Sequence, residues 1–141
     1  MEPTTTQTIR SLASSIGVEL EDLLLSCFYC TRWLTTLDKI LFAHAGLGLH
    51  CKEGLYYGAC QPCVRSAARV DFLLNYESFV STRRAAEIFQ QPFPNLEVRC
   101  WSCLRHLNNA EKCDIVCRDG DVAILKNKPR ALCTLCSIGL Q

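Results

Sequence analysis

The sequence predicts an α+β fold made of two duplicated small modules, each with a strand, a helix, a hairpin and a second helix, joined by a linker helix. The prediction depends on a repeated cysteine frame, on matching element patterns around both copies and on an apolar helical pattern between them. In each frame a C-x-x-C pair precedes 29 residues and a second C-x-x-C pair, and the second frame lies 73 positions after the first. The frame cysteines are Cys27, Cys30, Cys60 and Cys63, then Cys100, Cys103, Cys133 and Cys136.

Two C-x-x-C pairs can place four thiolates around one Zn²⁺, so we expect two structural zinc ions per chain. Disulfides, scattered core cysteines and redox C-x-x-C motifs are the alternatives. Disulfide scaffolds usually carry a secretory leader, and the N-terminus shows no apolar run. Redox C-x-x-C motifs occur singly beside a βαβ pattern. The eleven cysteines therefore predict a reducing compartment, cytosol or nucleus.

The bulk properties favour a protein-binding role. The chain has 141 residues, a net charge of +1 and a pI of about 7.5, which is weak support for nucleic-acid binding. Hydrophobic residues make up 49%, and small modules leave part of such surface exposed for partners. No run approaches the roughly 18 apolar residues that a membrane span needs.

The predicted segments follow the frame. They are an N-terminal arm with short helices at 1–26, a first zinc module at 27–63, a linker helix at 64–81, a lead-in to the second module at 82–99, a second zinc module at 100–136, and a short tail at 137–141.

Local signals predict the elements inside these segments. The arm helices break near Gly17, and helices at 36–45 and 109–117 each follow a Thr or Asn that can act as N-cap. Hairpins are predicted with strands at 47–52 and 55–59, and at 121–125 and 128–132; a further short helix is predicted at 82–90. Their turns carry Gly54 and Asn127, the residue types that best tolerate positive φ.

The linker carries two apolar stripes at helical spacing. Val64, Ala68, Phe72 and Phe79 form one stripe, and Ala67, Val70 and Leu74 form the other. A helix that is apolar on two sides is expected to be buried on two sides. We therefore predict a rigid linker helix that packs against both modules.

Several other motifs have a structural interpretation. Leu20–Leu24 reads LxxLL, but leucines at this spacing usually face a core. Cys51 beside His50 is the one Cys–His neighbour pair, whereas catalytic pairs are neighbours in space, so we expect packing and no enzyme. Cys113 and Cys117 lie one helical turn apart and are also expected in the core.

The doubled frame, the 36 residues between its copies and the tripeptide Gly58-Ala59-Cys60 resemble the papillomavirus early protein 6 family from about Leu20 to Cys136. The resemblance implies a non-enzymatic viral adaptor that captures helical LxxLL peptides of host proteins in a groove between the modules and the linker helix. Implied partners are a ubiquitin-protein ligase, a Mastermind-like coactivator of Notch signalling or a paxillin-type adhesion protein. The implied effects are on apoptosis, innate immunity and cell transformation, in the host cytoplasm and nucleus.

The resemblance also assigns peptide-binding positions. The apolar trough positions are Tyr29, Leu47, Ala59, Val64, Ala67 and Leu74, and the basic positions are Lys52, Arg99 and Lys128. A terminal Gln does not suit a PDZ pocket, so PDZ proteins are not expected partners. The alternative function is a zinc-finger transcription regulator that binds nucleic acid. We expect a monomer or a weak dimer with no membrane association.

Overall fold

The computed structural model describes residues 7–138, and the chain divides into two compact units, Met1–Val64 and Arg65–Gln141. Each unit contains one cysteine frame. The linker at 64–81 and the lead-in at 82–99 fall almost entirely within the second unit. The predicted ends of the arm and tail, residues 1–6 and 139–141, lie outside the described residues.

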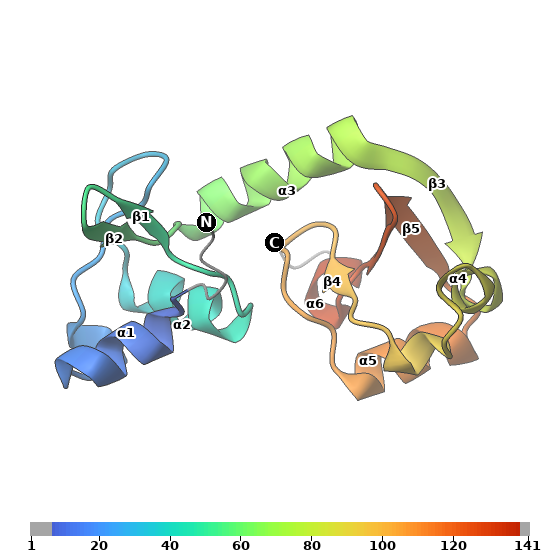
Figure 1. Ribbon diagram of the computed structural model, residues 1–141. Coiled ribbons are helices and arrows are strands. Elements are labelled where there is room, and N and C mark those ends of the chain that lie inside the picture. The colour runs from blue at the N-terminus through green and yellow to red at the C-terminus, as the bar shows by residue number, and fades with distance from the viewer. Residues whose placement is uncertain (1–6, 139–141) are drawn as a thin grey trace. The chain divides into compact units, whose positions relative to one another are not determined.

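Within residues 7–64 the first unit contains three helical segments, one hairpin and the first turn of a helix that begins at Gln61. Its elements in order are α1 (Ile9–Ile16), η1 (Leu20–Asp22), α2 (Thr36–His44), β1 (His50–Lys52) and β2 (Leu55–Tyr57). The two strands pair antiparallel, as Figure 1 shows.

Local capping explains where these helices begin and end. Thr8 accepts a hydrogen bond from the Ser11 backbone N–H at the start of α1, and Gly17 ends this helix at φ 87°. The predicted break near Gly17 is therefore confirmed. The buried apolar residues of this unit are Ile9, Leu12, Ala13, Leu23, Leu25, Cys27, Leu34, Phe42, Ala45, Leu49, Ala59, Cys60 and Val64.

The linker prediction is correct for a helix but wrong about where it ends. Helix α3 (Gln61–Asn75) gives way to strand β3 (Tyr76–Ser81), so Phe79 lies in a strand (Figure 1). Strand β3 pairs antiparallel with β5 (Asp121–Leu125), and Val80 lies opposite Val122. This pairing joins segments far apart in sequence, and such tertiary context overrides a local helical pattern.

Only one apolar stripe of α3 is buried. Val64 is 2% exposed and Ala68 is fully buried, in agreement with the first stripe. Val70 and Leu74 of the second stripe are 53% and 76% exposed. The expectation that the helix is buried on two sides is therefore wrong, and α3 presents an apolar surface to solvent.

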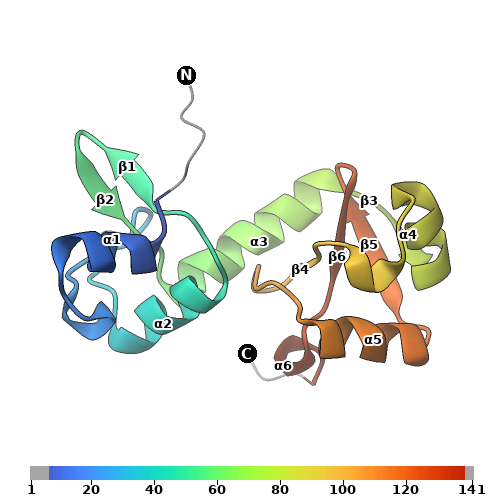
Figure 2. The ribbon, with the colours of Figure 1, turned by 60° about the horizontal axis from the view of Figure 1, so that its bottom comes forward.

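The second unit is built on a four-stranded sheet with the strand order β3-β5-β6-β4. Strand β6 (Lys128–Ala131) pairs antiparallel with β5 and parallel with the short β4 (Arg99–Cys100), an arrangement visible in Figure 2. The helical segments are α4 (Thr82–Phe89), η2 (Phe93–Asn95), α5 (Asn109–Cys117) and α6 (Thr134–Ser137).

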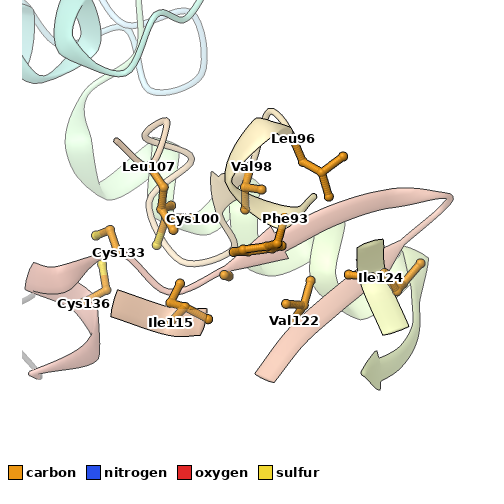
Figure 3. Close-up of a cluster of buried hydrophobic side chains, with 12 residues drawn as sticks. Phe93, Leu96, Val98, Cys100, Leu107, Ile115, Val122, Ile124, Cys133 and Cys136 are labelled. Carbon is orange, nitrogen blue, oxygen red and sulfur yellow. The ribbon is translucent and has the colours of Figure 1, made fainter. Parts of the chain in front are cut away.

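The core of the second unit merges with its cysteine cluster. Figure 3 shows Phe93, Val98 and Val122 in one cluster of side chains with Cys100 and Cys133. The full cluster is Ala85, Phe93, Leu96, Val98, Cys100, Leu107, Ile115, Val122, Ile124, Ala131, Cys133 and Cys136. The hydrophobic core of this unit therefore packs directly against the cysteines of its frame.

The remaining element predictions are largely confirmed. Helices α2, α4 and α5 match their predicted ranges within one residue, while β1 begins at His50 instead of residue 47. The hairpin turns have positive φ at Gly54 (80°) and Asn127 (67°). In the described part of the chain, no helix has both the length and the apolar character to cross a membrane.

Candidate metal centres and peptide-binding residues

The eight frame cysteines form two clusters, one in each unit. Within each cluster all four Sγ atoms lie within 4.8 Å of one another. The Sγ atoms of Cys30 and Cys60 are 3.7 Å apart, and those of Cys103 and Cys133 are 3.8 Å apart. A tetrahedron with metal–sulfur bonds of about 2.3 Å has edges of about 3.8 Å, so both clusters fit a tetrahedral metal ion.

A tight backbone turn forms the first corner of each cluster. The Cys27 N–H donates to Arg32 O and the Cys100 N–H donates to Arg105 O, both at 2.8 Å. Thr31 and Leu104, which follow the first C-x-x-C pairs, both adopt φ 66°. Left-handed backbone is unfavourable for such side chains, so each turn contains local strain.

A helix N-terminus forms the second corner. The Val64 N–H donates to Cys60 O at 2.9 Å, and the Ser137 N–H donates to Cys133 O at 2.8 Å. The last frame cysteine of each copy therefore lies in the first turn of α3 or α6, as the sequence predicted.

The thiols of each cluster do not ionise equally. Burial raises the pKa of Cys27, but backbone N–H groups that donate to its sulfur outweigh burial and lower the pKa to about 6. Burial and neighbouring sulfurs raise the pKa of Cys63 far above its usual value. In the second cluster, hydrogen bonds from Cys100 and Cys103 lower the pKa of Cys133 strongly, and the pKa of Cys103 rises. Four adjacent thiolates repel, and a bound dication allows all of them to ionise.

A buried carboxylate connects the central helix of each module to its closing C-x-x-C pair. In the first module Asp38 accepts hydrogen bonds from the backbone N–H groups of Thr35 (3.1 Å) and Gln61 (3.1 Å). In the second, Glu111 accepts them from Asn108 (3.0 Å) and Thr134 (2.8 Å). Gln61 and Thr134 directly follow a ligand cysteine, so the carboxylate fixes the backbone beside the cluster.

An arginine neutralises each of these carboxylates. Arg32 Nη2 lies 3.5 Å from Asp38 Oδ2, and Arg105 Nη2 lies 2.6 Å from Glu111 Oε2. The sulfur of Cys60 raises the pKa of Arg32. Burial lowers the pKa of Arg105, but Glu111 and Cys133 outweigh burial and raise it. Each guanidinium therefore lies beside both a carboxylate and a cluster sulfur.

A buried lysine completes the arrangement in each module. Lys39 Nζ donates to Glu21 O at 2.8 Å and to Leu23 O at 2.9 Å. Lys112 Nζ donates to Leu96 O at 2.8 Å. We call the Arg, acid and Lys of one module its polar brace: Arg32, Asp38 and Lys39 in the first, and Arg105, Glu111 and Lys112 in the second.

The polar braces were not predicted, although the sequence carries a signal for them. Their members lie 73 positions apart, the offset of the cysteine frames. Asp38 and Glu111 lie in the first turns of α2 and α5, where acidic residues are common. The burial of adjacent acidic and basic residues depends on partners from distant segments, which a local pattern does not identify.

The predicted trough residues differ in exposure. Ala59 and Val64 are buried in the first unit, whereas Tyr29 is 55% exposed and Leu74 is 76% exposed. Leu47 and Ala67 are partly buried, and Lys52 is exposed on β1. Tyr29 Oη lies 3.3 Å from His50 Nε2, which places this tyrosine against the first hairpin.

The predicted basic residues of the second unit lie together. Arg99 and Lys128 line a pocket of about 280 Å³ with Glu97, His106, Pro129 and Arg130. Burial and the charge of Arg130 lower the pKa of Arg99, and burial and Arg99 lower that of His106. Positive charge is thus concentrated in one pocket of this unit.

The cysteines outside the frames differ from expectation. Cys51, Cys113 and Cys117 are all exposed, so their predicted core positions are wrong. Cys51 lies on β1, and Cys113 and Cys117 lie on α5. The LxxLL-like segment is mixed: Leu23 is buried as predicted, whereas Leu24 is 78% exposed.

Comparison with known proteins places these clusters in a family. The family model described as Early Protein (E6) matches residues 27–136, from the first frame cysteine to the last. The chain is 33% identical over 132 residues to Protein E6 of human papillomavirus type 1, which covers 94% of each sequence. It is 31% identical over 136 residues to that of human papillomavirus 25 (96% of this chain, 84% of the relative) and 29% identical over 130 residues to that of canine oral papillomavirus strain Y62 (92% and 89%). The chain therefore belongs to the papillomavirus E6 early-protein family.

Proposed function

We propose that both four-cysteine clusters bind structural Zn²⁺. The distances between sulfurs match a tetrahedral ion, and all-thiolate tetrahedral sites are typical of structural zinc. When bound, zinc stabilises four thiolates at one point, and the polar braces hold the backbone that presents them. Elemental analysis should find two zinc ions per chain; one or none would contradict the proposal.

We further propose that the chain is a non-enzymatic adaptor that binds helical LxxLL peptides of host proteins. The observation that carries this proposal is the surface of the second unit, where α3 exposes Val70, Leu73 and Leu74 (72% and 76% for the two leucines). Arg99 and Lys128 of the same unit line one basic pocket. An amphipathic peptide helix needs an apolar surface for its leucines and cations for its flanking acids.

The first unit would contribute the other peptide contacts. Its candidates are Tyr29, Leu47 and Lys52, which are exposed or partly buried. The proposed partners are a Mastermind-like coactivator, a ubiquitin-protein ligase or a paxillin-type adhesion protein in the host cytoplasm and nucleus. Binding would redirect ubiquitination or inhibit Notch transcription, with effects on apoptosis, innate immunity and transformation.

Charge substitutions in the full chain test the adaptor proposal. Leu74→Arg and Leu47→Arg should each weaken binding of a fluorescent LxxLL peptide at least tenfold, about 1.4 kcal/mol, because they place a charge on apolar contact surface. Val116→Arg, which changes an exposed apolar residue of α5, is the matched control and should bind normally. Retained zinc stoichiometry shows that the variants are folded.

The same assay separates the adaptor from a nucleic-acid binder. Normal peptide binding by both leucine variants would reject the assigned surface. No peptide binding by the wild type, together with tight binding of duplex DNA at moderate salt, would favour the zinc-finger regulator instead.

A further inference from the structure

An arginine of helix α3 reaches the second cysteine cluster. Arg65 Nη1 lies 3.7 Å from Cys136 Sγ and 3.5 Å from Ser102 Oγ. Cys136 is buried, and Ser102 lies in the chain between two other cysteines of the same cluster, Cys100 and Cys103. A guanidinium that donates to a sulfur stabilises its thiolate form, because such a hydrogen bond is charge-assisted. Arg65 can therefore stabilise a metal ligand while a neighbouring hydroxyl group accepts from the same nitrogen.

A second contact joins the same face of α3 to the same turn. Phe72 follows Arg65 by about two helical turns and so lies on the same side of the helix. The ring centroids of Phe72 and Trp101 are 4.9 Å apart. Trp101 and Ser102 are the two residues inside the first C-x-x-C pair of this cluster. The Cys100–Cys103 turn therefore contacts α3 at two points.

The second centre is the more buried of the two. Three of its four cysteines are buried, compared with two of four in the first cluster. Four thiolates around a zinc dication leave a net charge of about −2, which is unfavourable in a buried site unless cations compensate it. Arg105 lies beside Cys133, and Arg65 beside Cys136 supplies a second positive charge. Two guanidinium groups thus match the excess negative charge of this centre.

Arg65 does not belong to the repeated polar braces. The position 73 residues further along the chain is Ile138, at the C-terminal cap of α6, where the side chain is apolar. The braces, in contrast, have an arginine at the equivalent position of both modules. The contact between Arg65 and the cluster is therefore an addition made by α3 and does not come from the repeat.

We propose that Arg65 is a positioning residue of the second metal centre. Its guanidinium stabilises the Cys136 thiolate when metal is bound, and together with Phe72 it fastens α3 to the Cys100–Cys103 turn. This inference rests on the proposed zinc sites and adds a residue outside the cysteine frames to one of them. Because α3 also carries the exposed apolar residues of the proposed peptide surface, metal at the second centre would hold that surface in place.

Cadmium NMR of the full chain tests the contact with the metal ligand. Cadmium is a soft cation that thiolates bind tightly, and the wild type should give two resonances, one for each centre. In Arg65→Met the resonance correlated with the β-protons of Cys136 should shift while the other stays, because one sulfur loses a donor. Arg65→Lys keeps a positive charge and an N–H donor, so its shift should be smaller.

Metal release and amide exchange measure the consequences. With excess EDTA, the second-centre resonance of Arg65→Met should disappear about tenfold faster than that of the wild type, and the first-centre resonance at an unchanged rate. At equal metal content, the amides of residues 66–69 should also exchange faster. Arg69→Met, at an exposed arginine one helical turn further along α3, is the matched control and should change none of these measurements.

The outcomes separate this inference from the zinc proposal. Fewer than two metal ions in the wild type would contradict both. Two ions, with an unshifted Cys136 resonance or an unchanged release rate in Arg65→Met, would overturn the inference alone. If Arg65→Met does not retain a second metal ion, Arg65→Lys decides between the outcomes. A second ion with a shifted resonance in Arg65→Lys supports the inference, and an unshifted resonance overturns it.

Discussion

The two modules share a polar brace but surround it with different amounts of structure. The sheet of the first module is a two-stranded hairpin, whereas the second module has a four-stranded sheet that recruits β3 from the linker. The cysteines differ accordingly: Cys30 is exposed, and its counterpart Cys103 is partly buried. Both modules therefore keep the polar brace next to their cysteine frame, although their cores differ in size.

The strength of the brace also differs between the modules. Arg32, whose side chain is 47% exposed, lies 3.5 Å from Asp38, while Arg105 is 19% exposed and lies 2.6 Å from Glu111. Water screens the first pair more than the second. Equivalent brace residues should therefore contribute unequally to the free energy of unfolding. The same substitution made at the equivalent position of each module measures this difference.

Loss of a ligand cysteine should have the largest effect. Cys60→Ala and Cys133→Ala should each remove one zinc ion and unfold the module concerned, because a structural site contributes on the order of 10 kcal/mol or more. In the second module, β3 and β5 should keep partial amide-exchange protection from the larger sheet. Zinc analysis and amide exchange monitored by NMR check both outcomes. The control Cys51→Ala, at an exposed cysteine, should change neither the zinc content nor the amide exchange. A first module that stays folded in Cys60→Ala would show that zinc is not needed to hold this module folded.

Neutralising the brace acid should have the next largest effect. Glu111→Gln leaves Arg105 with reduced charge compensation and should lower the free energy of unfolding by about 3 kcal/mol. Asp38→Asn should cost about 1 kcal/mol, because Arg32 is half exposed. Urea unfolding measures both variants. Equal costs would show that exposure does not govern the difference between the braces.

The pH dependence of Glu111 has a defined sign. Burial raises its pKa, but Arg105 and the N–H groups of Thr134 and Asn108 outweigh burial and lower it. Its contribution to stability is therefore present above the ordinary carboxyl pKa of about 4.3 and is lost as pH falls through the lower, folded value. The stability difference between wild type and Glu111→Gln, measured by urea unfolding at a series of pH values, should shrink over that interval.

Replacing the brace lysine should cost less. Lys39→Met removes the donor of two backbone carbonyls and Lys112→Met that of one, while methionine preserves most of the volume. We expect losses of about 2 and 1 kcal/mol in urea unfolding, because each buried carbonyl loses its partner. Lys52→Met, at an exposed lysine, should leave stability unchanged. A larger loss for Lys112→Met would reverse the predicted order.

Relieving backbone strain should have the smallest effect, and a stabilising one. Thr31→Gly should raise the free energy of unfolding by about 1 kcal/mol, since glycine adopts φ 66° without steric cost. Leu104→Gly should gain less, because this side chain is partly buried and its packing is lost. Thermal unfolding measures both. The converse control is Gly17→Ala at φ 87°, which should destabilise by a similar amount.

The sequence by itself determined the features that depend on near neighbours. The two cysteines of each C-x-x-C pair come together because residues three positions apart share one turn. Helices α2 and α5 begin where Thr35 and Asn108 cap them, and Gly54 and Asn127 supply the positive φ of the hairpin turns. These features need only a few consecutive residues, so their signals remain visible along the chain.

Tertiary structure alone decided the features that depend on distant partners. Residues 76–81 form a strand because they pair with β5. The free energy of this pairing comes from residues 40 or more positions away, so the local sequence pattern does not reveal it. The burial of Ala59 and the exposure of Leu74 follow from which elements cover them. The Arg130–Asp71 contact joins β6 to α3 through side chains 59 positions apart, and only the packing of these two elements brings their charges together.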